Sequence, residues 1–458
     1  MSRRSSSNTN NNLLLYVDSL LQWRLSFLLI ACLVLGGTAQ IVMTYKLPLY
    51  LISLLIIGQT LSSKTREPIK TLWRPPFIIG AAFFALFVLY LLPLPPAIWT
   101  GLSGREHIVD GFNAIGSDIP WLPISLTPEI TLFSLFDFLP VIALIVVMTL
   151  SAGRREIKNS QMTIVALATF AALLGLIQTL SGPESFRLYE NFTPKFAVGL
   201  FSNANHLATF LAMALPLALY LTSRSEKSVG WQNDLKLSQI FAAFATIVII
   251  MGVFLSGSSA GYALLLFALV LTLWIINKGS KMGYTVLIFG VALLLIILID
   301  AFFLSGQLQE VLKKISIETQ TSRQVIVETS LAARRDFGFF GSGPGSFADI
   351  YYLYEDHDMI TPLFVNEAHN DYLQVWFEMG WPGLLILLAG LIWLGWQAFI
   401  ASTSSGRRRR KAFIFIIIAL IPLIHAIVDY NFRNISISVL FVYFIVRIDT
   451  LCHDLKNN

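Results

Sequence analysis

The 458-residue chain is 55% hydrophobic and only 13% charged, whereas about a quarter of the residues in a typical globular protein are charged. This composition, with a mean hydropathy of +0.70, excludes a soluble enzyme with a single membrane anchor. It also excludes an outer-membrane β-barrel, whose strands are only weakly hydrophobic. A disordered or nucleic-acid-binding chain is excluded as well, although the formal net charge is +5.

Apolar segments follow a polar tail, residues 1–24, which we predict to be cytoplasmic. Because a spanning helix needs about 20 mostly apolar residues, we predict an all-α polytopic membrane protein with about twelve transmembrane helices. Nine of these spans are expected within residues 25–304 and three within 381–449. The predicted spans are 25–43, 47–62, 76–93, 131–150, 162–180, 206–222, 238–255, 260–277, 284–304, 381–399, 412–428 and 434–449.

Lys and Arg are concentrated in every second connection, most densely at residues 407–411. Cytoplasmic loops carry an excess of these residues, so both termini, including a short tail at 450–458, are predicted to be cytoplasmic. The segment 305–380 then forms one large loop on the outer side of the membrane. A loop of this length is usually functional, and we expect short helices in it, at 306–315, 322–335 and 366–379.

The last of these expected helices carries a candidate general base. Read as a helix, the segment places His369, Tyr372, Leu373 and Trp376 on one face. Partial desolvation beside the membrane would favour the neutral imidazole that a general base requires. The alternative is a histidine at a helix entry that is satisfied by backbone groups, and the residues alone favour this alternative.

Three other features of the loop could bind ligands. Gly341, Gly343 and Gly345 surround Pro344 and could form an anion-binding turn or simply a sharp loop. Among the loop cations, Arg323 could contact phosphate in a bidentate manner. A metal-binding reading of the segment 356–358, Asp-His-Asp, is weak, and a solvated loop is favoured there.

Ionisable residues inside predicted spans are functional candidates by default. Asp137 and Asp300 lie in the fourth and ninth predicted spans. His425, Asp429 and Arg433 cluster at the outer end of the eleventh, where Asp429 and Arg433 could pair with each other. His206 opens the sixth span and could serve only to cap that helix.

The order of these motifs resembles the O-antigen ligase and polymerase superfamily of bacterial inner membranes. The resemblance rests on Arg323, then Gly341-Ser-Gly-Pro-Gly-Ser-Phe347, then Ala368-His-Asn-Asp-Tyr-Leu373, then Glu378-Met-Gly-Trp-Pro-Gly383, which enters a span. The segments Gly199-Leu-Phe-Ser-Asn-Ala-Asn-His-Leu-Ala208 and His425-Ala-Ile-Val-Asp-Tyr430 are also similar to the family's pattern.

The resemblance implies a GT-C-like helical enzyme that transfers a glycan from undecaprenyl pyrophosphate in the periplasm. The acceptor would be lipid A-core for a ligase or a lipid-linked repeat unit for a polymerase. Besides these substrates we expect contact with membrane lipids, no nucleic acid, no cofactor and no metal. His369 takes the role of the catalytic base and Arg323 that of the phosphate-binding arginine. The expected substrate-binding residues are Gly343, Gly345, Asn370, Tyr372, Arg433 and Lys195.

One departure and one rival class accompany this resemblance. Ser259 stands where the family often has an arginine, so Lys195, Arg187 or Arg433 would have to supply the missing cation. A multi-span transporter or a polysaccharide exporter is the alternative function. Transporter sites usually lie near the membrane midplane in broken helices, whereas the polar residues here gather in one outer loop.

Overall fold

The computed structural model describes residues 22–39, 43–62, 72–182, 184–190, 196–223, 237–278, 323–356 and 365–456. Within these residues all extended regular structure is helical, and the only strand-like pairing is an isolated bridge between Leu94 and Leu122. The predicted helix 306–315, the predicted span 284–304 and the candidate residues Lys195 and Asp300 lie outside the described residues.

Eight helical segments within the described ranges are long and apolar enough to cross a membrane. They are α3 (Met43–Ser62), α7 with α8 (Pro128–Phe136 and Phe138–Leu150), α9 (Arg154–Ser181), α10 (Ala204–Thr222), α11 (Leu237–Leu255), α12 (Ser259–Ile276), α16 (Asp371–Thr403) and α18 (Ile435–Lys456). The protein is therefore a polytopic, α-helical membrane protein, as the composition predicts.

Three further helices also coincide with predicted spans. The helices α2 (Arg24–Leu35) and α4 (Pro75–Leu91) are apolar but shorter. The helix α17 (Gly406–His425) begins with a run of basic residues and is apolar afterwards. Every predicted span in the described residues thus falls on a helix, and the total of twelve stays a prediction.

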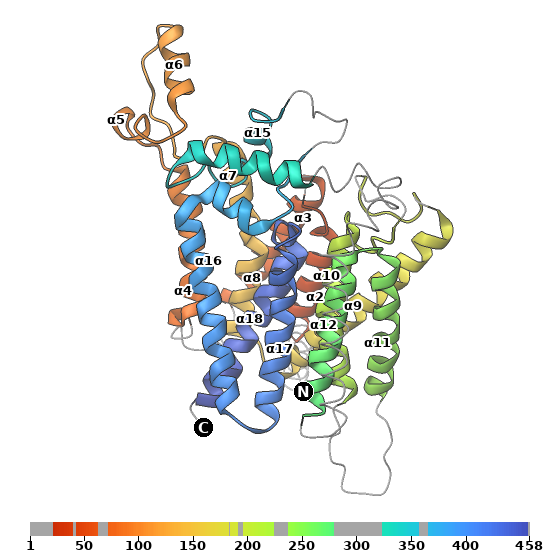
Figure 1. Ribbon diagram of the computed structural model, residues 1–458. Helices are drawn as coiled ribbons and strands as arrows, with labels where there is room; N and C mark the ends of the chain where they lie inside the picture. The colour runs from red at the N-terminus through yellow and green to blue at the C-terminus, as the bar shows by residue number, and fades with distance from the viewer. Residues whose placement is uncertain are drawn as a thin grey trace, which may run out of the picture.

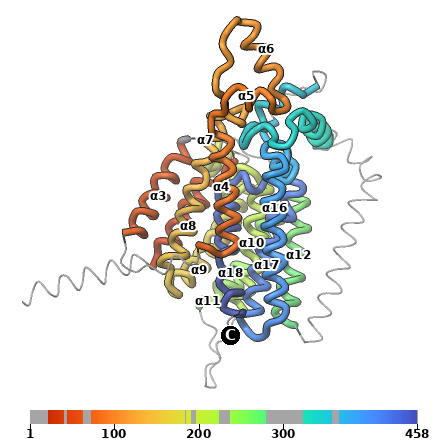
Figure 2. The backbone as a smooth tube through the Cα atoms, turned by 90° about the vertical axis from the view of Figure 1, so that its left-hand side faces the viewer, coloured from red at the N-terminus to blue at the C-terminus, as the bar shows by residue number. Residues whose placement is uncertain are grey.

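Shorter helices lie between the long ones. They are α5 (Pro96–Trp99), α6 (Glu106–Ala114), α15 (Phe347–Tyr351), a helix at residues 323–334, and the 3₁₀ turns η3 (Arg335–Phe337) and η5 (Asn431–Arg433). Both views show α5, α6 and α15 beyond one end of the bundle, while the C-terminus lies at the opposite end (Figures 1 and 2). The predicted helix 322–335 is confirmed from residue 323 onward.

The helix α10 forms the centre of the bundle. It packs against α9, α11, α12 and α17, and most of its side chains are buried. Small residues permit this close approach: a Cβ on Gly261 of α12 would lie 2.6 Å from the Cβ of Ala208 in α10. Packing through small residues is the usual basis of helix association in membranes. The site described below is therefore built partly on the most deeply buried of the candidate spans.

The helix α16 is kinked where the glycine-rich loop meets it. Gly380 has a φ of 58°, and Pro382, just beyond it, has no N–H to donate. The N–H groups of Ser342 and Gly343 donate to the carbonyls of Phe377 and Glu378, at 3.2 and 2.8 Å. The loop thus satisfies backbone groups that the kink frees, and it fixes the outer segment to the span.

Candidate functional site

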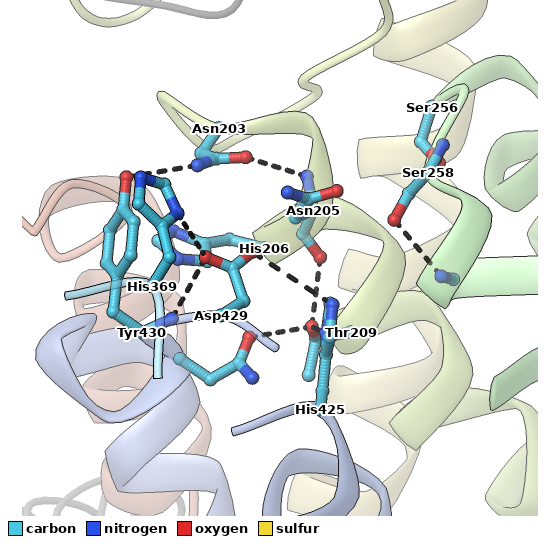
Figure 3. A network of polar contacts seen from close by, with 12 residues as sticks. Asn203, Asn205, His206, Thr209, Ser256, Ser258, His369, His425, Asp429 and Tyr430 are labelled. Carbon is cyan, nitrogen blue, oxygen red and sulfur yellow. Dashed lines mark hydrogen bonds and ion pairs between the residues drawn. The ribbon is translucent and has the colours of Figure 1, made fainter. Parts of the chain in front are cut away.

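The candidate site lies at the outer end of the bundle, where three segments meet. These segments are the residues before α16, the turn after α17, and the first turn of α10. Figure 3 shows His369, Asp429 and His206, one from each segment, converging on one another. The sequence motifs that contain these residues are far apart in the chain, and the fold brings them together.

His369 lies before the helix rather than on it, so the prediction of a helix over 366–379 is wrong at its start. The helix α16 begins at Asp371, with the side chain of Asn370 as its N-cap accepting from the N–H of Leu373 at 3.0 Å. His369 itself has a φ of 51°, in the left-handed region that residues other than glycine rarely occupy. His369 therefore does not share a helical face with Tyr372 and Trp376, which belong to α16.

The imidazole of His369 faces a buried carboxylate. Its Nδ1 lies 3.5 Å from Oδ1 of Asp429, and its ring meets that of Tyr430 edge to face at 4.9 Å between centroids. The side chain of Asp429 is completely buried, whereas that of His369 is 25% exposed. A carboxylate at Nδ1 selects the tautomer with a proton on Nδ1, which leaves the lone pair of Nε2 available as a base.

Two further histidines surround Asp429. Nε2 of His425 lies 4.0 Å from its Oδ2, and Nδ1 of His425 is 2.6 Å from the hydroxyl of Thr209. The ring of His206 is buried against Tyr430, with the ring centroids 5.1 Å apart. His206 is therefore not a helix cap as the sequence suggested. Asn203 caps α10, since its side chain accepts from the N–H of Asn205 at 2.8 Å.

The histidines hold Asp429 in its ionised form. Burial by itself would raise the pKa of Asp429, but the interaction with His369 and the charges of the surrounding histidines outweigh burial and hold the pKa below its usual range. The N–H of Tyr430 also donates to Oδ1, at 2.9 Å. The site therefore offers a buried, negatively charged partner to any histidine that gains a proton.

Arg433 does not pair with Asp429, so the pairing considered from the sequence is wrong. Its Nη2 lies 2.9 Å from Oε2 of Glu378, and its Nε lies 3.8 Å from Oδ1 of Asp371. The reason is local geometry, because the segment from Asp429 to Arg433 is a turn followed by η5 and not a continuous α-helix. The charge of Arg433 is thus largely matched by two carboxylates of α16.

The carboxylate of Glu367 is the third that interacts with the charge of Arg433. Gln374 donates to Glu367 and, at 3.1 Å, to Glu378, while its own Oε1 accepts from the N–H of Ala368 at 2.9 Å. Burial raises the pKa of Glu367 to about 7, against the opposing charge of Arg433. The backbone on the N-terminal side of His369 is therefore fixed by a hydrogen-bonded network that titrates near neutral pH.

A partly buried ion pair between spans acts on the same network. Nζ of Lys46 in α3 is 2.8 Å from Oδ2 of Asp137, where α7 meets α8, and the hydroxyl of Tyr50 also donates to Asp137. The charge of Lys46 acts on Glu367. The sequence points to Asp137 but not to its partners, because nothing in the local pattern indicates a lysine in another span.

The other expected substrate-binding residues have structural contacts. The N–H of Gly343 is already donated to Glu378, so it is not available to an anion, and a Cβ at Gly343 or Gly345 would collide with Ser125 or Ser134. Tyr372 donates to the carbonyl of Leu423 at 2.8 Å and so ties α16 to α17. Roles in substrate binding for Gly343, Gly345, Asn370 and Tyr372 stay predictions.

The arginine expected to hold phosphate is exposed and acts electrostatically on the histidine site. Arg323 opens the helix at residues 323–334. Burial raises the pKa of Tyr430, and the charge of Arg323 is among the influences that oppose this rise. Arg323 is therefore near enough to act on the site electrostatically.

The helix α12 begins at Ser259, where the family often has an arginine. The preceding residue, Ser258, caps this helix by accepting from the N–H of Gly261 at 3.0 Å.

Within the described ranges, no three His, Cys, Asp or Glu side chains are arranged to hold one metal ion. Of the acidic motif predicted from sequence, only Asp356 lies in those ranges. Independence from metal stays a prediction.

The fold and the site define a polytopic membrane protein with a buried histidine–aspartate cluster at one end of its helical bundle. Residues 244–388 match the model of a protein family described as O-Antigen ligase. This match supports the resemblance to the O-antigen ligase and polymerase superfamily that the motifs predict. No match was found among curated proteins.

The matched segment runs from α11 through α12 and the outer loop into α16, and it contains both Arg323 and His369. The family places the protein in the biosynthesis of surface polysaccharides, with glycosyltransferase-like chemistry. Asp429 and His206 lie outside the match, and only the fold shows that they complete the surroundings of His369.

Proposed function

We propose that the protein transfers or polymerises a glycan from undecaprenyl pyrophosphate onto an acceptor hydroxyl at the periplasmic face of the inner membrane. The acceptor would be lipid A-core or another lipid-linked repeat unit. The observation that carries this proposal is the pairing of His369 with the buried carboxylate of Asp429. The family match supports it, since His369 lies inside the matched segment.

In this mechanism Nε2 of His369 removes the proton of the acceptor hydroxyl as its oxygen attacks the anomeric carbon. The bond from that carbon to the pyrophosphate oxygen breaks, and its electron pair leaves with the lipid pyrophosphate. Attack opposite the leaving group inverts the anomeric centre. Asp429 is a positioning residue that holds the imidazole and stabilises the imidazolium. Arg323 would stabilise the charge that develops on the departing pyrophosphate.

The proposed topology places the site outside the cytoplasm. Both termini would be cytoplasmic, with tails at 1–24 and 450–458. The catalytic loop at 305–380 would lie between two groups of spans, at 25–304 and 381–449. This arrangement agrees with the positive-inside bias of the sequence. It is also supported by the position of α15, which belongs to the same outer segment and lies at the end of the bundle opposite the C-terminus (Figure 1).

The decisive experiment uses purified protein with a synthetic lipid-pyrophosphate-linked repeat unit. We expect product from the wild type, also in excess chelator, and a rate about 10²- to 10⁴-fold lower for His369→Ala. The matched control is His107→Ala, because His107 is exposed on α6, away from the bundle. Full activity of His369→Ala would eliminate the base assignment, and absence of any transfer by the wild type would contradict the proposed reaction.

Complementation of a deletion strain separates the two acceptor classes. Unpolymerised single units on a polysaccharide gel would identify the polymerase reaction, whereas free polymer beside bare lipid A-core would identify the ligase reaction. Arg323→Lys should fail to complement, because a point ammonium cannot reproduce the bidentate contact of a guanidinium with phosphate. Membrane levels of each variant are measured in parallel, so that loss of folded protein is distinguished from loss of chemistry.

A further inference from the structure

The end of the bundle opposite His369 contains a hollow lined by cations from two helices. The hollow has a volume of about 360 Å³ and lies where the end of α12 packs against the start of α17. Its lining residues are Ile275, Lys278, Gly406, Arg407, Arg409, Arg410 and Phe413. Four of these seven residues are positively charged, so the hollow has a strongly positive potential.

These cations have no acidic counterpart in the part of the chain that the structure describes, where none of them forms an ion pair with a carboxylate. Arg409 donates to the carbonyl of Ser404 at 3.1 Å and lies over the ring of Phe413 at 5.6 Å. Lys278 lies over the ring of Trp274 at 5.3 Å. Carbonyls and rings orient the cations but do not neutralise them, and their mutual repulsion favours a bound anion.

Two features beside the cations indicate what kind of anion fits. The first is the start of α17, where Ser405 makes no side-chain cap hydrogen bond; uncapped N–H groups of a helix favour phosphate. The second is the apolar part of the lining, Ile275 and Phe413. A hollow that combines cations with apolar side chains at the end of spanning helices matches the two chemistries of a lipid, a charged headgroup and the acyl chains below it.

We propose that this hollow binds the phosphate headgroup of an anionic membrane phospholipid. The lipid would join the end of α12 to the start of α17. The far end of α17 carries His425 and the far end of α12 carries the Ser258 cap. The proposal does not depend on the reaction performed at His369, because binding can be measured without any glycan substrate.

The test measures lipid retention by the purified full-length protein, using native mass spectrometry and thermal unfolding in detergent. Phosphatidylglycerol is compared with zwitterionic phosphatidylcholine, and inorganic phosphate is the third arm. The double variant Arg407→Gln/Arg410→Gln removes two cations that line the hollow. The control Arg154→Gln/Arg408→Gln removes two exposed cations from the same end of the bundle, neither of which lines it.

We expect the wild type and the control to retain phosphatidylglycerol at least about tenfold more tightly than the double variant. Phosphatidylcholine should be retained equally weakly by all three proteins. Equal retention of phosphatidylglycerol by the variant and the control would overturn the proposal. Stabilisation of the wild type by inorganic phosphate to the same extent would also overturn it, and would identify a site for soluble anions. If the double variant does not fold, Lys278→Gln is compared with Arg408→Gln in the same assays.

Discussion

Replacing Asp429 by Asn tests the proposed mechanism most directly. The change removes the negative charge that faces His369 at 3.5 Å but keeps the size of the side chain. An amide oxygen can still accept the N–H of Tyr430, which now donates to Oδ1 at 2.9 Å. The local backbone should therefore survive, and only the electrostatic partner of the imidazole is lost.

The size of the effect follows from the distance. Two unit charges 3.5 Å apart interact with about 5 kcal/mol at an effective dielectric constant of about 20. The imidazole is 25% exposed, and it carries only part of a full charge in the transition state. About half of that energy, 2–3 kcal/mol, should be lost, which corresponds to a rate roughly 30- to 150-fold lower.

Transfer by the purified variant is measured at saturating acceptor, beside its thermal unfolding. The control is Asp449→Asn, which removes another buried aspartate charge, paired with Arg74 at 2.8 Å. Asp449 belongs to the last turns of α18, far from His369. Wild-type rates in a folded Asp429→Asn protein would refute the argument. Equal rate losses in the two variants would show that general destabilisation, and not the partnership with His369, causes the effect.

Three further outcomes are expected. The free energy of unfolding should fall by up to about 3 kcal/mol as pH rises from 4.5, the ordinary pKa of a Glu side chain, to about 7, because folding favours the protonated form of Glu367. Glu367→Gln should lack this fall. Equal pH responses of the variant and the wild type would contradict the prediction. Gly380→Ala should destabilise the protein by roughly 1–3 kcal/mol, because the added Cβ would lie 2.0 Å from a carbonyl oxygen. Gly390→Ala, with open space around the added Cβ, should not destabilise it. The unfolding temperatures of the two variants test this difference, and equal temperatures would contradict it. Reporter fusions at Gly104 and Gly406 should behave as periplasmic and cytoplasmic, and the same behaviour at both positions would refute the topology.

The spans were predictable because burial in lipid demands long apolar runs, whatever the partners of each helix. Every predicted span in the described ranges coincides with a helix. Their ends were less predictable: the apolar pattern placed the start of one span at Trp381, but the same helix begins at Asp371 and only kinks at Gly380. Hydrophobicity indicates which residues lie in the lipid, but it does not indicate how far a helix continues outside the lipid.

The site was predictable as a set of motifs but not as a geometry. The conformation of His369 could not be foreseen, because a positive φ in a residue other than glycine has no local sequence signal. The spacing of Asp429 and Arg433 suggested a pair on one helical turn, yet the chain leaves the helix there. The contact between Lys46 and Asp137 joins distant segments, and only the packing of whole helices determines it.

The helices α16 and α17 form a hairpin that is closed at both ends. A short connection joins them at one end, and at the other the N–H of Asp371 donates to the carbonyls of Ala426 and Asp429, at 2.9 and 3.3 Å. A rocking motion of one helix against the other would break these bonds and separate His369 from its partner. A cycle of alternating access that opens this hairpin would therefore break the contacts that position His369.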